Sequence, residues 1–169
     1  MGLNSGTSFI DISDLEFPRI IGFLPTHTTN SSWRDIKTYG NYAFIVSEAS
    51  GHGMQVFDLT KLGNLAVDSP SVTFTEDAHY SGFGRAHNIV INEAQGYAYA
   101  VGTNTYNGGP HFIDISSPLN PLAAGGYGED TYSHDAQVVT YNGPDSDYTG
   151  KEILIGSNQN EVVIVDVTD

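Results

Sequence analysis

The sequence contains no cysteine and few basic residues, and each shortage excludes a class of protein. Without cysteine, the 169-residue chain can form no disulfide, no thiolate zinc site and no cysteine nucleophile. Only six residues are Lys or Arg against 20 Asp or Glu, which gives a formal net charge of -14. So few cations cannot neutralise a run of phosphates, and nucleic acid and anionic membrane surfaces are therefore poor partners.

Long apolar stretches and helical patterns are also missing. No run of 18 or more apolar residues occurs, and if the protein is exported its signal lies outside these residues. No window keeps a helical period over three turns, and the connecting segments are rich in Gly, Asn, Ser and Pro. Nucleophile elbow, phosphate-loop and His-Glu-x-x-His motifs are absent, which lowers the expectation of familiar hydrolase or nucleotide chemistry.

What the sequence does contain is one strand-like motif repeated four times. Each copy is a short apolar run followed by Asp, one aliphatic residue and Ser or Thr; the repeated residues are Asp11, Asp58, Asp114 and Asp166. Further runs rich in Tyr, Phe, Ile and Val flank each copy, so the repeating unit holds four strands. We expect the repeated Asp to be structural, its carboxylate accepting backbone N–H groups from the turn that follows.

A four-stranded unit that recurs about every 50 residues is typical of a β-propeller. The sequence predicts an all-β fold: a β-propeller segment of four-stranded antiparallel blades, with two full blades and a partial blade at each end. The expected units are 1–30, 31–84, 85–131 and 132–169, which together form a single segment. A β-solenoid or a two-sheet sandwich explains the repeat less well, because solenoid coils are shorter and a sandwich needs no repeat.

Both end units are expected to be incomplete, because the chain begins at a second strand and stops just after a third. This pattern predicts a segment of a longer chain, since an open sheet edge is a template for further pairing. The expected partners are the remainder of the same propeller or other copies of the chain.

Several motifs resemble those of the LVIVD-repeat proteins, and within them the choice-of-anchor B family. The matching runs cover nearly the whole chain; they are 33–37, 44–48, 51–59, 86–93, 97–103, 134–137, 143–145 and 164–169. The resemblance implies a bacterial protein that is exported and anchored at the cell surface, with a propeller-like fold and no established activity. It also leads us to expect Cys in some relatives near Gly126 and Val138, where this chain has none.

Three strands expected to line the propeller centre begin with a polar pair at the same register. The pairs are Arg34–Asp35, His87–Asn88 and His134–Asp135. Imidazole and carboxylate groups suit zinc, manganese or iron, and they also suit acid–base chemistry near neutral pH. The predicted metal ligands are Asp35, His87, His134 and Asp135, with His52 on a loop expected to approach the same end. Arg34 argues against a metal, and the alternative is that each pair hydrogen-bonds a neighbouring blade.

A second candidate site is the acidic loop between the first two strands of the last unit. Asp145, Asp147 and Glu152 offer several oxygens around a tight turn, which is the ligand set that calcium prefers. Lys151 reduces the negative charge of this loop, and the full EF-hand pattern is missing. The alternative is therefore an acidic surface turn that binds no metal.

Repetition, acidity and the missing motifs favour a non-enzymatic scaffold or binding module that in one variant assembles with itself. The resemblance implies that it is extracellular or at the cell surface. The alternative is a metal-dependent enzyme or a metal or ligand binder that uses the His/Asp cluster, with calcium or another divalent metal as cofactor.

Overall fold

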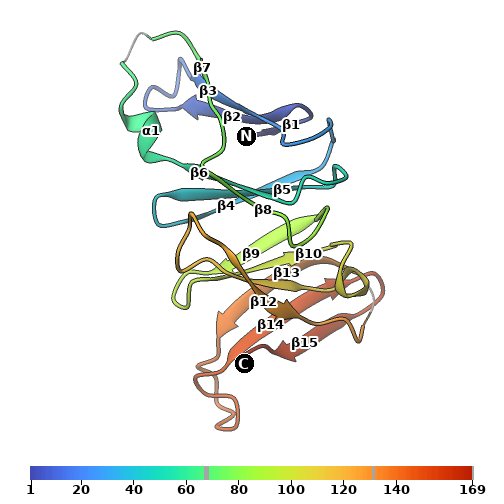
Figure 1. The fold of residues 1–169 in the computed structure, drawn as a ribbon. Coiled ribbons are helices and arrows are strands. Elements are labelled where there is room, and N and C mark those ends of the chain that lie inside the picture. Colours follow the sequence, from blue (N-terminus) through green and yellow to red (C-terminus); the bar gives the residue numbers. More distant parts are fainter. Residues whose placement is uncertain (67–68, 131, 169) are drawn as a thin grey trace.

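Four β-sheets, stacked in the order of the chain, make up the computed structural model (Figure 1). The structure describes residues 1–66, 69–130 and 132–168, so positions 67–68, 131 and 169 of the expected units lie outside the described residues. Strands account for 46% of the described residues and helices for 4%, which confirms the all-β prediction. Neighbouring strands pair antiparallel, except that β3 pairs with β7 in parallel.

Each sheet draws its strands from one stretch of the chain, apart from β7. Sheet 1 contains β1 (Gly2–Leu3), β2 (Gly6–Asp11), β3 (Arg19–Pro25) and β7 (Val72–Thr73). Sheet 2 contains β4 (Arg34–Tyr39), β5 (Tyr42–Ser47), β6 (Met54–Asp58) and β8 (Ala78–Tyr80). Sheet 3 contains β9 (Asn88–Asn92), β10 (Tyr97–Val101), β11 (His111–Asp114) and β12 (Leu122–Gly126). Sheet 4 contains β13 (Ser133–Thr140), β14 (Glu152–Asn158) and β15 (Val162–Asp166).

The core lies between the sheets, because successive side chains of a strand point to opposite faces. In β5, Ala43 packs in the apolar cluster that sheet 2 shares with sheet 1, whereas Phe44 packs in the cluster shared with sheet 3. In β10, Ala98 packs toward sheet 2 and Tyr99 toward sheet 4. The same alternation therefore fills three successive interfaces.

The repeated Asp closes the turn after the third strand of each unit, as the sequence predicts. In all four copies its Oδ1 accepts the backbone N–H of the Ser or Thr two residues later, at 2.9–3.2 Å. These hydrogen bonds favour the ionised form and lower the pKa of Asp11, Asp58 and Asp114. The pKa of Asp166 falls to about 2, chiefly because Lys151 Nζ also donates to it.

The connection between β6 and β8 leaves sheet 2 and returns to it. It forms the short helix α1 (Thr60–Gly63), and then adds β7 to the outer edge of sheet 1. Phe74, just after β7, packs edge-on against Phe57 of sheet 2 and Phe9 of sheet 1. This excursion ties the first two sheets together and gives sheet 1 a fourth strand that the repeat does not predict.

In the part of the chain that the structure describes, helical structure is limited to α1 and the 3-10 turn η1 (Tyr106–Gly108). Within the described ranges, no helix has the length and apolar character needed to span a membrane.

Candidate functional site

The polar residues predicted at the inner strands do occupy one register position. Asp35, Asn88 and Asp135 each lie opposite the same position of the second strand; the partners are Val46, Val101 and Ser157. Asp35 Oδ2 accepts the backbone N–H of Ile89 in sheet 3 at 3.1 Å. Asn88 Nδ2 donates to the backbone carbonyl of His134 in sheet 4 at 3.3 Å. These contacts match the structural alternative, in which the polar residues link neighbouring sheets.

Asp35 has little capacity left for a metal ion. Its Oδ1 accepts the N–H of Ile36 at 2.8 Å, and Lys37 Nζ lies 2.9 Å from its Oδ2. Asp135 at the equivalent position accepts the N–H of Ala136, also at 2.8 Å. Both carboxylates are therefore engaged by their own strands.

Arg34 and His52 form a polar link between sheets 1 and 2, so His52 does approach the end where Arg34 lies. Arg34 donates through Nε to the carbonyl of Leu3 at 3.3 Å and through Nη2 to Thr26 Oγ1 at 3.0 Å. Its Nη1 lies 2.8 Å from His52 Nε2. His52 is fully buried, and its Nδ1 lies 3.1 Å from the carbonyl of Gly53. Burial lowers the pKa of His52 to about 4, and the charge of Arg34 adds to this shift.

His87 and His134, predicted together from the sequence, do meet. Their ring centroids lie 4.1 Å apart, and Trp33 stacks on the His87 ring at 4.7 Å. His87 Nδ1 lies 2.7 Å from Glu48 Oε1, while its buried Nε2 has no hydrogen-bond partner in the part of the chain that the structure describes. The structure thus gathers the two imidazoles of the predicted site but directs the two carboxylates elsewhere, and the metal site stays a prediction.

The acidic loop does not bring its three predicted ligands together. Asp145 Oδ1 accepts the N–H of Asp147 at 3.1 Å in an exposed turn. Glu152 instead points into the interface between sheets 3 and 4, where its Oε1 accepts the O–H of Tyr99 at 2.5 Å. The calcium site likewise stays a prediction.

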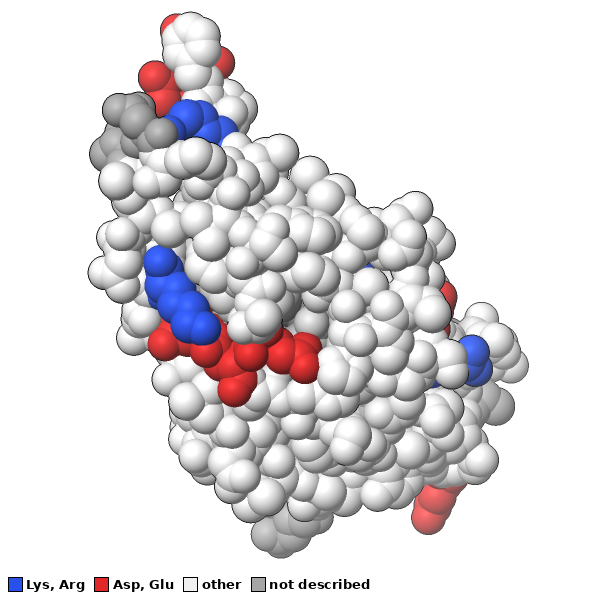
Figure 2. All heavy atoms as spheres, turned by 45° about the horizontal axis from the view of Figure 1, so that its top comes forward, with Lys and Arg blue, Asp and Glu red and all other residues white. Residues whose placement is uncertain are grey.

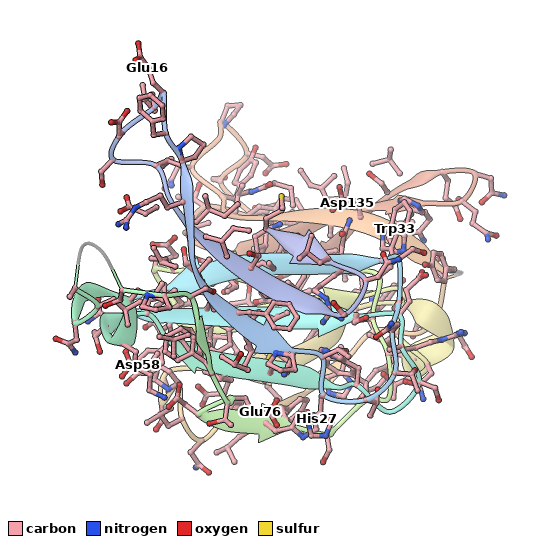
Figure 3. All side chains as sticks on the ribbon, turned by 90° about the horizontal axis from the view of Figure 1, so that it is seen from above. Glu16, His27, Trp33, Asp58, Glu76 and Asp135 are labelled. Carbon is pink, nitrogen blue, oxygen red and sulfur yellow. The ribbon has the colours of Figure 1, made fainter. Side chains whose placement is uncertain are left out.

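A cluster that sequence reasoning missed lies where sheets 1 and 2 meet at their outer edge. In the described ranges, His27, Glu76 and His79 are the one group of three or more His, Asp or Glu whose ligand atoms lie within 4.8 Å of one another. Figure 3 shows His27 and Glu76 side by side, well away from Trp33 and Asp135. The sequence signal is weak: Glu76 and His79 form a Glu-x-x-His pair, but His27 lies about 50 residues earlier.

On the face drawn in Figure 2, acidic and basic side chains form small mixed groups on a largely uncharged surface. Among the described residues, Lys61 and Asp77 form one ion pair.

The sequence matches no protein-family model, and a search of curated proteins finds no match either. Neither comparison identifies an LVIVD-repeat or choice-of-anchor B protein.

Proposed function

We propose that the protein is a non-catalytic scaffold or binding module, built from consecutive propeller blades, that assembles head to tail with further copies of itself. Its location at the cell surface is part of the proposal and rests on the motif resemblance alone. The observation that carries self-assembly is an apolar pair on sheet 4, Ile155 and Ile164, which is exposed although its counterparts are packed between sheets.

The pairing of the second and third strands shows which residues of sheets 2 and 3 correspond to Ile155 and Ile164. Ile155 lies opposite Ile164, as Phe44 lies opposite Val56 in sheet 2 and Tyr99 lies opposite Phe112 in sheet 3. The earlier pairs pack in the clusters toward the following sheet. Ile155 is 36% exposed and Ile164 is 70% exposed. Sheet 4 therefore presents the same apolar surface that sheets 2 and 3 present to their successors.

Sheet 1 presents the complementary surface at the other end. Ile12 follows the repeated Asp of its unit and is 63% exposed. Its counterparts pack against the preceding sheet; they are Leu59, Ile115 and Val167. Ile20 on the neighbouring strand, opposite Ile10, is 58% exposed. Exposed apolar groups of this extent at both ends of the stack suit protein interfaces.

A second copy of the chain can cover both exposed faces, because each copy carries the surface that the other face lacks. If sheet 1 of one copy packs on sheet 4 of another, the contact repeats the interface that already joins neighbouring sheets within the chain. Such an interface is heterologous, so repeated addition closes a ring or extends a filament. The burial of apolar area supplies the driving force.

Sedimentation of the purified protein over a range of concentrations tests this proposal. The wild type is expected to form dimers and larger species, while I164D and I12D each block one face and sediment as monomers. An equimolar mixture of the two variants keeps one good face on each partner, so it should form a one-to-one dimer and nothing larger. A monomeric wild type, or a mixture that stays monomeric, would overturn head-to-tail assembly.

The second candidate function is metal or ligand binding at His87 and His134, which one observation favours: the unpartnered, buried Nε2 of His87. A buried polar atom without a partner is costly, and a bound ligand would satisfy it. Elemental analysis of the purified protein tests it. Stoichiometric metal that is lost in H87A and H134A supports the site, and no metal in the wild type argues against it.

A further inference from the structure

We propose that His27, Glu76 and His79 form a binding site for a divalent transition metal ion of the zinc type, at the outer edge between sheets 1 and 2. The site does not depend on self-assembly or on the inner-strand histidines. His27 comes from the loop after β3, whereas Glu76 precedes β8 and His79 lies within it.

The donor set selects the metal. Two imidazoles and one carboxylate are nitrogen and oxygen ligands that suit zinc, copper or nickel, whereas calcium and magnesium require oxygen ligands alone. Three protein ligands leave a fourth position for water, the arrangement found where zinc keeps an open site. A hollow of about 250 Å³, lined in part by His27 and Glu76, lies next to the cluster and has room for that water.

Hydrogen bonds around the cluster already orient two of the three ligands. His79 Nε2 lies 2.7 Å from the carbonyl oxygen of His52, so this nitrogen carries the proton and Nδ1 keeps its lone pair for a metal. Gln55 Nε2 donates to Glu76 Oε2 at 2.7 Å, and Gln55 is itself buried and held by the carbonyl of Pro25. Supporting contacts of this kind are typical of metal-binding His and carboxylate groups.

The third ligand is close enough to join them. His27 Nδ1 lies 2.8 Å from Glu76 Oε1, and the His27 and His79 rings stack with centroids 3.7 Å apart and planes at 8°. Parallel rings cannot both direct an in-plane lone pair at one ion, so binding requires the His27 ring to tilt away from His79. His27 is exposed and lies in a loop, which permits this rotation.

The local charge does not oppose a cation. The guanidinium of Arg34 is hydrogen-bonded to His52 and Thr26 rather than to a residue of the cluster. Glu76 supplies one negative charge, and the chain as a whole carries -14. A bound ion would join the loop of sheet 1 to the outer strand of sheet 2.

Isothermal titration of the metal-free protein with Zn²⁺ tests the proposal. The wild type is expected to bind one equivalent, and calcium in excess should not compete because it disfavours nitrogen ligands. H27Q, E76Q and H79Q should each abolish the high-affinity phase. Q55A should weaken binding by about 10- to 100-fold, because Gln55 positions Glu76 without touching the ion.

E93Q is the matched control, since it removes an exposed carboxylate in the turn between β9 and β10 of sheet 3, which belongs to neither candidate metal site. It should keep full zinc affinity and the same zinc-induced rise in melting temperature as the wild type. H27Q is the decisive variant, because His27 is exposed and we expect its replacement to leave the metal-free fold and melting temperature close to those of the wild type. Absence of binding in the wild type, full binding in H27Q, or loss of binding in E93Q would each overturn the site.

Discussion

The carboxylate of Asp35 in sheet 2 accepts the backbone N–H of Ile89 in sheet 3, so a single side chain fastens two neighbouring sheets. Removing it leaves a partly buried amide without a partner, which costs about 1–3 kcal/mol. We therefore expect D35A to lower the free energy of unfolding in urea by that amount. K37A removes only the exposed ion pair to Asp35 and should cost less than about 1 kcal/mol. Equal losses in the two variants would mean that the bond between the sheets contributes little.

Gly102 lies where sheet 3 meets the side chains of His87 and Tyr132. Its φ is +64°, and a Cβ there would lie 2.5 Å from the Cβ of His87 and 2.7 Å from the hydroxyl of Tyr132. Gly40 has a similar φ of +54° with nothing within 4 Å of the same position. Backbone strain alone should make G40A cost about 1–2 kcal/mol, whereas overpacking should add roughly 1–3 kcal/mol to the cost of G102A. Urea denaturation measures both, and equal costs would show that His87 and Tyr132 can move aside.

Much of this architecture follows from the repeat in the sequence. The Asp turns were predicted because Asp followed two residues later by Ser or Thr is a local signal that needs no knowledge of the fold. The common register of Asp35, Asn88 and Asp135 was predictable for a related reason, since period-2 patterning fixes which residues share a face.

Other features depend on contacts that no local pattern encodes. β7 is two residues long and pairs in parallel with β3, so it has neither alternation nor a hairpin turn to reveal it. In the sequence Glu152 belongs to an acidic loop, yet in the structure its carboxylate accepts a hydrogen bond from the buried hydroxyl of Tyr99. His27 and His79 meet only because the connection after β6 crosses to sheet 1 and returns.

His52 should make stability fall in mild acid. Its pKa is about 4 in the folded protein, against about 6.5 in an unfolded chain, so the unfolded state binds more protons between these values. The stabilisation is therefore complete above pH 6.5 and is lost as the pH falls toward 4, by roughly 3 kcal/mol in all. Denaturant midpoints measured from pH 7 to pH 4 test this.

H52Q is the control for that pH dependence. It should reduce the slope of stability against pH without removing it, because burial lowers the pKa of His111 as well. The same slope in H52Q and in the wild type would mean that His52 is not the group that titrates.

Tyr99 and Glu152 join sheets 3 and 4 through a buried hydrogen bond. Burial, and then the carboxylate of Glu152, raise the pKa of Tyr99, so its hydroxyl stays protonated and donates to Glu152 Oε1. In a double-mutant cycle of Y99F, E152Q and the combined variant, we expect a coupling free energy of about 1–3 kcal/mol. The cycle also separates this role from calcium binding. If Glu152 held calcium, adding calcium to the metal-free protein would raise the unfolding midpoint of the wild type and not that of E152Q, whereas the hydrogen bond predicts no effect of calcium on either.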